Sequence, residues 1–380
     1  MLRLALQMLV GDTTKFLGLI FGVAFATLLM GQQLGIFFGL LERAASIVYD
    51  AREADLWVMD PAVKTVDAPY PVRDTQLPRV RGVAGVAWAV PFFRANAQVR
   101  TPAGTLENAL ILGVDDVSLV GLPDTVVMGS QQDLRRPESI ALNPFGFRLL
   151  FPGEPLSLGK TLELNDRRAV VRAIVDVSPS FAGNVVIYTR YDLALTYTNN
   201  GRNQLSFILG KSADGVPAPE VARRISRATD LKALTAPQMR SQSIWYVIAN
   251  TGIPISFGAV VFLGVVVGIA IVGLTFNQFI SENMKQYAAL KAIGVRNGKL
   301  TLMTLTQGLF VGVIGLGLGL GVAGAFFHFL PPRVDALKGF YLPIWVAVAV
   351  GATALIIVLL STLFGLRRVL FVDPATVFRA

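Results

Sequence analysis

The run FLGLIFGVAFATLLMGQQLGIFFGLL, residues 16–41, stands alone near the N-terminus and contains no Asp, Glu, Lys or Arg. A helix needs about 20 apolar residues to cross about 30 Å of hydrocarbon, so this run is long enough to span a membrane. Further runs of this kind follow only after about two hundred ordinary residues, at Val247–Phe276, Leu300–Leu330 and Pro343–Leu366. Their order predicts one span, a large inserted domain and then three more spans.

The overall composition agrees with a membrane protein, because 53% of the residues are hydrophobic, 16% are charged and the mean hydropathy is +0.57. The first run is not typical of a secretory signal. It is too long for a signal core, and the ERAAS at 42–46 is a poor match to a small-x-small cleavage site. We therefore interpret it as a membrane span.

The net charge of +9 lies beside the predicted spans, and this placement argues against a nucleic-acid-binding protein. Loops on the cytoplasmic side of a membrane carry an excess of Lys and Arg. The pattern therefore predicts that both termini and the 277–299 loop are cytoplasmic and that residues 42–246 are external. The basic residues are Arg3, Lys15, Lys285, Lys291, Arg296, Lys299, Arg367, Arg368 and Arg379.

The inserted region has no cysteine, so it must be held by an ordinary core rather than by disulfides. Short alternating segments such as ENALILGV (107–114) and AVVRAIVDV (169–177) are typical of strands, and turn residues separate them. Helical patterns occupy 191–198 and 219–229. We expect an α+β domain on two helical stalks, with a kink at Pro254 where the second stalk enters the membrane.

These patterns predict an N-terminal interfacial helix at 1–15, transmembrane helix 1 at 16–41, an external α+β domain with stalk helices at 42–240, a stalk and transmembrane helix 2 at 241–276, a cytoplasmic helix at 277–299, transmembrane helix 3 at 300–330, transmembrane helix 4 at 343–366 and a cytoplasmic tail at 367–380.

The sequence contains no pattern typical of a catalytic, cofactor or metal site. In GEPLSLGKT (153–161), five residues separate Gly153 from Gly159, whereas a phosphate-binding P-loop needs four, so we expect a turn before a strand. His328 is the only histidine. The spans lack Asp, Glu, Lys and Arg, which disfavours an ion-coupled carrier or a proton pump. We expect a non-catalytic protein that needs no cofactor.

Glycines spaced four residues apart recur in the first two spans, and they favour close packing of helices. The packing can lie within one chain or across a homodimer. We predict dimer packing for Gly18, Gly22, Gly31, Gly35, Gly39, Gly264 and Gly268.

The cytoplasmic segment SENMKQYAALKAIGVRNGK (281–299) predicts a short, well-defined helix. Ser281 can cap its start, Glu282 and Lys291 suit the helix dipole at its two ends, and Gly294 can stop it. One interpretation is a linker whose lysines contact anionic lipid. The other is a docking helix for a partner.

MKQYAALKAIGV (284–295) resembles the signature of the MacB/FtsX superfamily of ABC-transporter permeases, and FVDPATVFR (371–379) resembles the closing motif of that family. The start of the chain, residues 4–35, and ADLWVM (54–59) are most similar to the DevC-like branch. The resemblance covers the whole chain. Two positions depart from the pattern: Gln286 stands where relatives often have Glu, and Val295 where they have Ala.

The resemblance implies the permease subunit of an ABC exporter of MacB type, which lies in the bacterial inner membrane, forms a homodimer and binds a separate ATPase subunit. It also implies that the domain at 42–240 is periplasmic and that the helix at 277–299 is the coupling helix that binds the ATPase. Mechanotransmission would carry the ATP-driven motion to a periplasmic membrane-fusion adaptor and an outer-membrane channel. We expect Tyr287 and Leu290 to insert into the ATPase. The full set of expected docking residues is Glu282, Lys285, Tyr287, Leu290, Lys291 and Gly294.

The alternative function is that of an FtsX-like regulator, which transports nothing and relays ATPase cycling to a cell-wall hydrolase. The long insert favours the exporter. An independent channel or carrier is disfavoured because both an ATP-binding motif and intramembrane charge are missing from the sequence. The sequence does not identify the cargo.

Overall fold

The computed structural model describes residues 2–181, 185–198, 204–331, 333–334 and 337–371 of the chain. The chain divides into two compact units. One comprises residues 1–39 and 252–380 and contains the apolar helices. The other comprises residues 40–251 and contains the strands. The closing motif at 372–380 lies outside the described residues.

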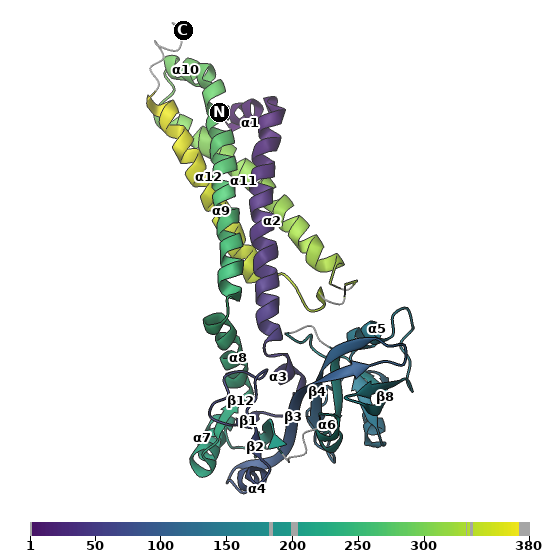
Figure 1. Cartoon of the computed structure of the whole chain (residues 1–380). Helices are drawn as coiled ribbons and strands as arrows, with labels where there is room; N and C mark the ends of the chain where they lie inside the picture. The colour runs from purple at the N-terminus through teal and green to yellow at the C-terminus, as the bar shows by residue number, and fades with distance from the viewer. Residues whose placement is uncertain (1, 182–184, 199–203, 332, 335–336, 372–380) are drawn as a thin grey trace. The chain divides into compact units, whose positions relative to one another are not determined.

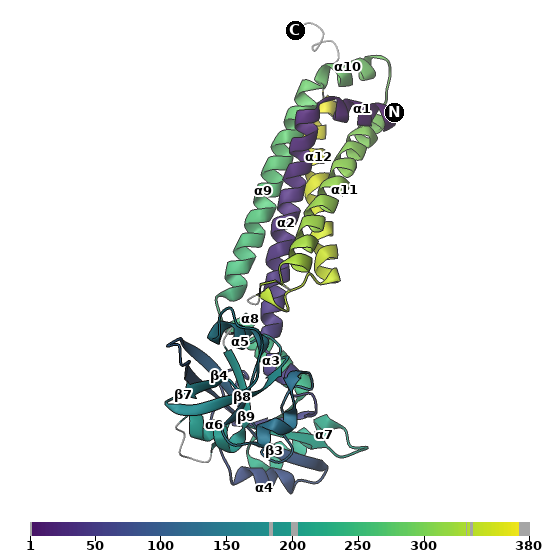
Figure 2. The same ribbon diagram turned by 90° about the vertical axis from the view of Figure 1, so that its right-hand side faces the viewer.

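Four helices among the described residues are long and apolar enough to cross a membrane, and Figures 1 and 2 show them running alongside one another. They are α2 (Thr13–Arg43), α9 (Ile253–Glu282), α11 (Asn297–Phe329) and α12 (Ile344–Phe371). With an α+β domain between the first and second of them, the expected fold class is confirmed.

The N-terminal helix α1 (Leu2–Gly11) is shorter than the predicted interfacial helix. Asp12 interrupts it and caps the next helix, because its carboxylate accepts a hydrogen bond from the backbone N–H of Lys15 at 3.3 Å. Ala5 and Leu9 form the buried face of α1, whereas Val10 is 45% exposed.

Pro254 does not kink a continuous helix, so that prediction is wrong. The helix α8 (Ala236–Asn250) ends before Thr251, whose backbone is extended, and α9 begins at Ile253 with Pro254 in its first turn. Proline is tolerated there because the first N–H groups of a helix have no partner within the helix.

The second unit combines short helices with one large mixed sheet and a small two-stranded sheet. The helical elements are α3 (Ser46–Asp50), α4 (Gln76–Arg81), η1 (Gln131–Arg135), α5 (Pro144–Leu150), α6 (Tyr191–Tyr197), α7 (Ala218–Thr229) and α8. The strands are β1 (Leu56–Met59), β2 (Val72–Arg73), β3 (Val86–Arg100), β4 (Leu106–Val114), β5 (Val126–Gly129), β6 (Ser139–Leu142), β7 (Thr161–Leu164), β8 (Arg167–Val175), β9 (Val185–Arg190), β10 (Gln204–Leu205), β11 (Phe207–Ser212) and β12 (Lys232–Thr235).

The strand order in the large sheet is β12-β1-β11-β3-β4-β9-β6-β8-β5, with β7 beside β3 and β8. The long strand β3 holds this sheet together, since its first half pairs with β11 and its second half pairs with β4. GEPLSLGKT is a turn that leads into β7, as predicted. In this turn Gly153 and Gly159 have positive φ angles, and Lys160 forms an ion pair with Glu154.

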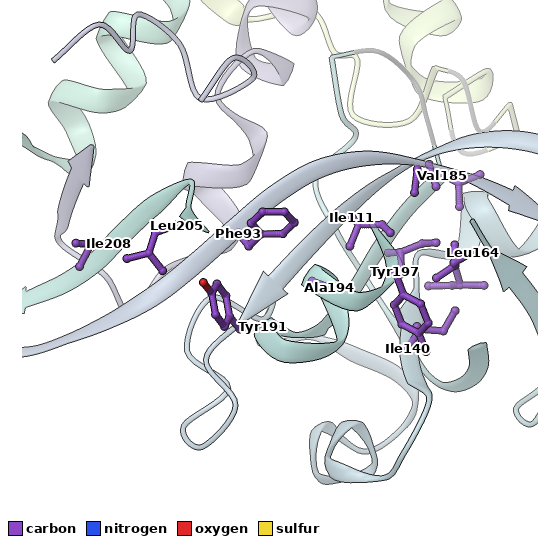
Figure 3. Packing of buried hydrophobic residues seen from close by; sticks show 14 of the residues in the cluster. Phe93, Ile111, Ile140, Leu164, Val185, Tyr191, Ala194, Tyr197, Leu205 and Ile208 are labelled. Carbon is purple, nitrogen blue, oxygen red and sulfur yellow. The ribbon is translucent and has the colours of Figure 1, made fainter. Parts of the chain in front are cut away.

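Both faces of the sheet are buried, and different helices cover them. Alternation along β1 sends Leu56 and Val58 into one core and Trp57 and Met59 into the other. The first core includes residues of α4, α5, α6 and α7, and Figure 3 shows part of it around Tyr191 and Tyr197 of α6. The second core includes residues of α3 and α8. These two helices are the ones that connect this unit to the membrane helices along the chain.

Asp50, at the end of α3, ties this helix to the sheet. Its carboxylate accepts the backbone N–H of Ser178 at 3.1 Å and the hydroxyl of Tyr188 at 3.4 Å. The side chain is buried among apolar groups, and this burial raises the pKa of Asp50 to about 6. The carboxylate therefore releases its proton less readily in the folded chain than in the unfolded chain.

This raised pKa predicts that the second unit becomes less stable as the pH rises. The folded chain holds the Asp50 proton up to about pH 6, whereas the unfolded chain releases it near 3.8. The stabilisation is therefore present below pH 3.8 and is lost between about pH 4 and 6, with an upper bound of about 3 kcal/mol. Asp50→Asn should remove this loss and raise stability at pH 7 to 8. Amide exchange of β8 and β9 in the full-length protein measures the effect.

The matched control is Asp124→Asn, which changes an exposed carboxylate in the same unit. It should keep the pH dependence of the wild type. If the stability of Asp50→Asn fell with pH as steeply as that of the wild type, the raised pKa of Asp50 would not be the cause of the loss.

Candidate functional site

The connection between α9 and α11 contains the short helix α10 (Met284–Ala292). α9 continues through Glu282, and Asn283 separates the two helices. The prediction that Ser281 caps α10 is wrong, because its Oγ instead donates to the carbonyl of Asn277 at 2.8 Å, inside the last turn of α9.

The end of α10 is set by Gly294, which lies at the predicted stop. Its φ of 90° is one that glycine adopts without strain. The N–H of Gly294 donates to the carbonyl of Lys291, and the N–H of Val295 donates to the carbonyl of Leu290. These two bonds form a Schellman motif, which satisfies carbonyls that the helix itself leaves unpaired.

Tyr287 is a core residue, so the prediction that it inserts into a partner is wrong. Its side chain is 1% exposed, and its hydroxyl donates to Oε1 of Gln307 in α11 at 3.0 Å. Burial raises the pKa of Tyr287 to about 12, against the smaller lowering effect of its hydrogen bonds to Thr304 and Gln307. The hydroxyl therefore keeps its proton at physiological pH. Leu290, the second expected apolar anchor, is half-buried against the same cluster.

The expected docking charges differ in their surroundings. Glu282 forms an ion pair with Lys15 near the start of α2, and Lys15 also pairs with Asp12 at 2.5 Å. Glu282 thus helps to join the ends of α2 and α9. Lys285 lies exposed on α10, and Lys291 is half-buried near its end.

Ile293, which the sequence analysis did not select, is the exposed apolar residue of this segment. It stands at the C-cap of α10 and its side chain is 81% exposed. The signal was an isoleucine directly before the glycine that stops the helix. A helix of nine residues is too short for periodicity alone to show which of its apolar side chains faces outward.

The glycines predicted for dimer packing lie against helices and loops of the same chain. A Cβ on Gly22 would lie 2.6 Å from Ile271, and one on Gly268 would lie 2.8 Å from Ala26, so these residues join α2 to α9. Gly35 packs on Phe327, and Gly39 packs on Phe340. Gly18, Gly31 and Gly264 also have neighbours within the chain, at Thr275, Ala323 and Met30. Each of the seven glycines therefore has a packing neighbour within the chain, and their place in a dimer interface stays a prediction.

His, Asp and Glu side chains form no group of three or more that could hold a metal ion, as far as the chain is described. His328 lies near the end of α11 and stacks edge-on against Phe329 at 4.9 Å.

Two family models together match most of the chain. The model described as MacB-like periplasmic core domain matches residues 16–228, and the model described as FtsX-like permease C-terminal matches residues 258–374. The first match alone covers more than half of the chain.

Several curated relatives are uncharacterized ABC transporter permeases. Rv0072 of Mycobacterium tuberculosis (strain H37Rv) is 26% identical over 314 residues, which is 82% of this chain and 79% of the relative. Mb2592 of Mycobacterium bovis is 27% identical over 316 residues, or 81% and 79% of the two chains.

Two solved structures are similar to part of the chain, each with 14% identity and a TM-score of 0.37. They are the extracellular domain of the noncanonic ABC-type transporter YknZ from Gram-positive bacteria and the periplasmic region of MacB from Actinobacillus actinomycetemcomitans. They cover 48% and 54% of this chain, respectively, and 98% of their own chains. The two family models carry the assignment: this chain belongs to the MacB/FtsX family of ABC transporter permeases.

Proposed function

We propose that this chain is the non-catalytic permease subunit of a MacB-type ABC exporter in the bacterial inner membrane. A separate ATPase subunit docks on α10, and the permease transmits its ATP-driven motion to the inserted domain on the other side of the membrane. The observation that carries this proposal is α10 itself. It is a short helix with a defined start and end, placed between two membrane helices, and it exposes Lys285 and Ile293.

The proposed orientation follows from charge. Arg3 and Lys15 precede or begin α2, and Lys285, Arg296 and Lys299 lie in or beside the α9–α11 connection. Basic residues are retained on the cytoplasmic side, so α10 faces the compartment that holds ATP and the N- and C-termini share that side. Residues 40–251 then lie in the periplasm.

The docking surface combines one apolar anchor with positive charge around it. An 81% exposed isoleucine at a helix end is costly in water, and its burial in a partner would recover about 1.5 kcal/mol or more. Lys285 and Arg296 are exposed in the same segment and would orient an acidic rim on the ATPase. This arrangement replaces the anchoring role that the sequence suggested for Tyr287.

The path to the inserted domain runs through α2 and α3. Only Ala44 and Ala45 separate these helices, and Asp50 of α3 hydrogen-bonds to Ser178 beyond β8. α3 also packs on α8, where the guanidinium of Arg240 lies 4.6 Å from the ring centroid of Tyr49. Both helices that lead toward the membrane thus share one core with the sheet. A displacement of either helix would therefore be transmitted to the sheet through this core.

The proposed active form is a homodimer. Only 17% of the most apolar part of α9 is buried within the chain, against 44% for α2. α9 therefore has the larger free apolar surface, which includes Phe262 and Leu274. A second copy would cover part of it. The inserted domains of the two copies would then act together on a membrane-fusion adaptor that leads to an outer-membrane channel.

The test is to purify the tagged chain with and without its ATPase subunit and to map its topology. The chain alone should not hydrolyse ATP, whereas the ATPase should co-purify with it. The chain has no cysteine of its own, so single cysteines at Ser130 and Asn297 are specific labels. In cells with a permeabilised outer membrane, a membrane-impermeant thiol reagent should label the cysteine introduced at Ser130 and should not label the cysteine introduced at Asn297. The reverse pattern would exclude docking of a cytoplasmic ATPase on α10, and capture of a cell-wall hydrolase instead of an adaptor would favour the regulator.

A further inference from the structure

We propose that Tyr287 and Gln307 form a buried hydrogen-bonded joint that makes α10 move as one body with α11 and α1. This inference rests on the proposed function, since it takes α10 as the helix on which the ATPase acts. It adds the means by which motion of α10 reaches the membrane helices, through side chains that do not touch the ATPase.

The joint consists of two consecutive hydrogen bonds that connect three helices. The Tyr287 hydroxyl of α10 donates to Oε1 of Gln307 in α11 at 3.0 Å. Nε2 of the same Gln307 donates to the backbone carbonyl of Ala5 in α1 at 2.8 Å. Tyr287 is 1% exposed, and Gln307 and Ala5 are fully buried. Water therefore does not compete for these bonds.

The chemistry of the three groups allows only one direction for these bonds. The carbonyl of Ala5 can only accept, so Gln307 must turn its NH2 toward it and its oxygen toward Tyr287. That oxygen requires a donor, which the tyrosine hydroxyl supplies. Sliding or rotation of α10 along α11 would leave buried polar groups unpaired, so the bonds fix the register of the three helices in a way that apolar contacts alone do not.

The joint matters because α10 is not continuous with the helix on either side of it. Asn283 breaks the helical path from α9, and Gly294 turns the chain at a φ of 90° before Arg296, which is extended. A helix between two such breaks can absorb an applied displacement by pivoting at its ends. The contacts of Tyr287, Met284 and Leu290 with the buried cluster hold α10 in place, and the joint fixes the direction in which it can move.

Three variants separate this role from simple stabilisation: Tyr287→Phe, Gln307→Leu and the double variant. All three leave the exposed face of α10 unchanged, so the affinity for the ATPase subunit should stay within twofold of the wild type. Tyr287→Phe leaves Oε1 of Gln307 without this donor, and Gln307→Leu leaves the Tyr287 hydroxyl with Thr304 alone, so each single variant should lower the thermal midpoint. Each should also lower the rate of ATP turnover by the complex at least threefold. This rate is measured per assembled permease–ATPase complex in nanodiscs.

The double variant is decisive because it replaces both side chains by apolar groups. Removing both partners of a buried hydrogen bond restores much of the stability that removing one costs. The thermal midpoint should therefore recover, while ATP turnover stays low because the directional link is gone. Recovery of turnover together with the midpoint would overturn the joint and leave only a structural role. Tyr70→Phe, which removes a hydroxyl from a 53% exposed tyrosine, should change neither quantity.

Amide exchange of the chain without any ATPase tests the joint independently of docking. Tyr287→Phe should raise exchange in α1 as well as in α10, because Gln307 then loses one of the partners that orient it toward Ala5. An unchanged α1 would overturn the joint. If α1 responds but the wild type fails to bind an ATPase at α10, the proposed function fails while the joint stands.

Discussion

Gly319→Ala is expected to prevent the chain from accumulating as a folded membrane protein, whereas Gly317→Ala and Gly321→Ala in the same helix should be tolerated. A Cβ on Gly319 would lie 2.5 Å from the carbonyl oxygen of Ala24 and 2.7 Å from Cβ of Thr27. The first of these atoms belongs to the backbone of α2 and cannot rotate away. The added methyl group therefore forces α2 and α11 apart.

The separation would be costly because a second contact depends on the same approach. A Cβ on Gly315, one turn earlier in α11, would lie 2.6 Å from Cβ of Val23 in α2. Overpacking one site in a well-packed interior costs about 1–3 kcal/mol, and opening the neighbouring site adds to it. Small residues let membrane helices approach closely. Loss of the close approach at Gly315 and Gly319 therefore removes contacts along much of α2.

The controls lie on the same helix and carry the same substitution. Among the described residues, no atom outside the backbone of α11 itself and the adjacent residues lies within 4 Å of a Cβ at Gly317 or Gly321. Alanine is favoured over glycine in a helix by about 1 kcal/mol, so these two variants should be neutral or slightly more stable. The yield of monodisperse protein in detergent and its thermal midpoint measure the difference. Equal yields and midpoints for all three variants would show that α2 and α11 are not in close contact at Gly319.

The spacing of the glycines predicts part of the helix packing but not which helices pack together. This spacing predicts that helices approach closely, and the structure contains such approaches between α2 and both α9 and α11. Spacing does not identify the helix on the other side. Gly35 meets Phe327, nearly three hundred residues away, and nothing local encodes that pairing. The choice between packing within the chain and packing across a dimer could therefore not be made from the sequence.

In the inserted domain, too, the sequence predicted the elements with a clear local pattern and not those that depend on distant residues. Alternation and turn residues predicted strands such as β4 and β8 and the helix α7, because their patterns are local. The short helices α4 and α5 were missed, since six or seven residues carry little periodicity. The parallel pairing of β4 with β9 depends on long-range contacts that no local pattern specifies.

The sequence predicted where α10 ends but not which of its side chains are exposed. Gly294 fixes where the helix stops because the backbone conformation it adopts is a local property. The burial of Tyr287 depends on Gln307 and on α1, which pack over it from distant parts of the sequence. A tyrosine on a short polar helix therefore looked like a surface anchor, while the exposed isoleucine was overlooked.

Ile293→Asp is expected to weaken association of the ATPase subunit at least tenfold. The side chain is 81% exposed at the C-cap of α10, and an apolar anchor buried in a partner's pocket can contribute about 2 kcal/mol or more. A carboxylate in that pocket would also lose its hydration without a partner. Lys285→Ala should have a smaller effect, because a charge at the rim of an interface changes the rate of encounter more than the affinity.

Ile293→Lys separates docking from the alternative in which this segment only rests on anionic lipid. A positive charge at the C-terminal end of a helix is favourable, so this variant keeps α10 folded. It also strengthens attraction to anionic lipid. Docking predicts that the Lys variant loses the ATPase as the Asp variant does, because the apolar anchor is gone in both. A lipid linker predicts that both variants keep the ATPase.

Co-purification of the ATPase with the tagged chain at matched expression, followed by titration of the purified subunits, gives the affinities. Val117→Asp is the matched control, because it places the same charge on a 78% exposed valine of the inserted domain. It should leave association unchanged. If the Asp and Lys variants at Ile293 both bind like the wild type, α10 does not dock the ATPase through this residue. If only the Asp variant weakens binding, the surface around Ile293 senses charge rather than burying an apolar side chain.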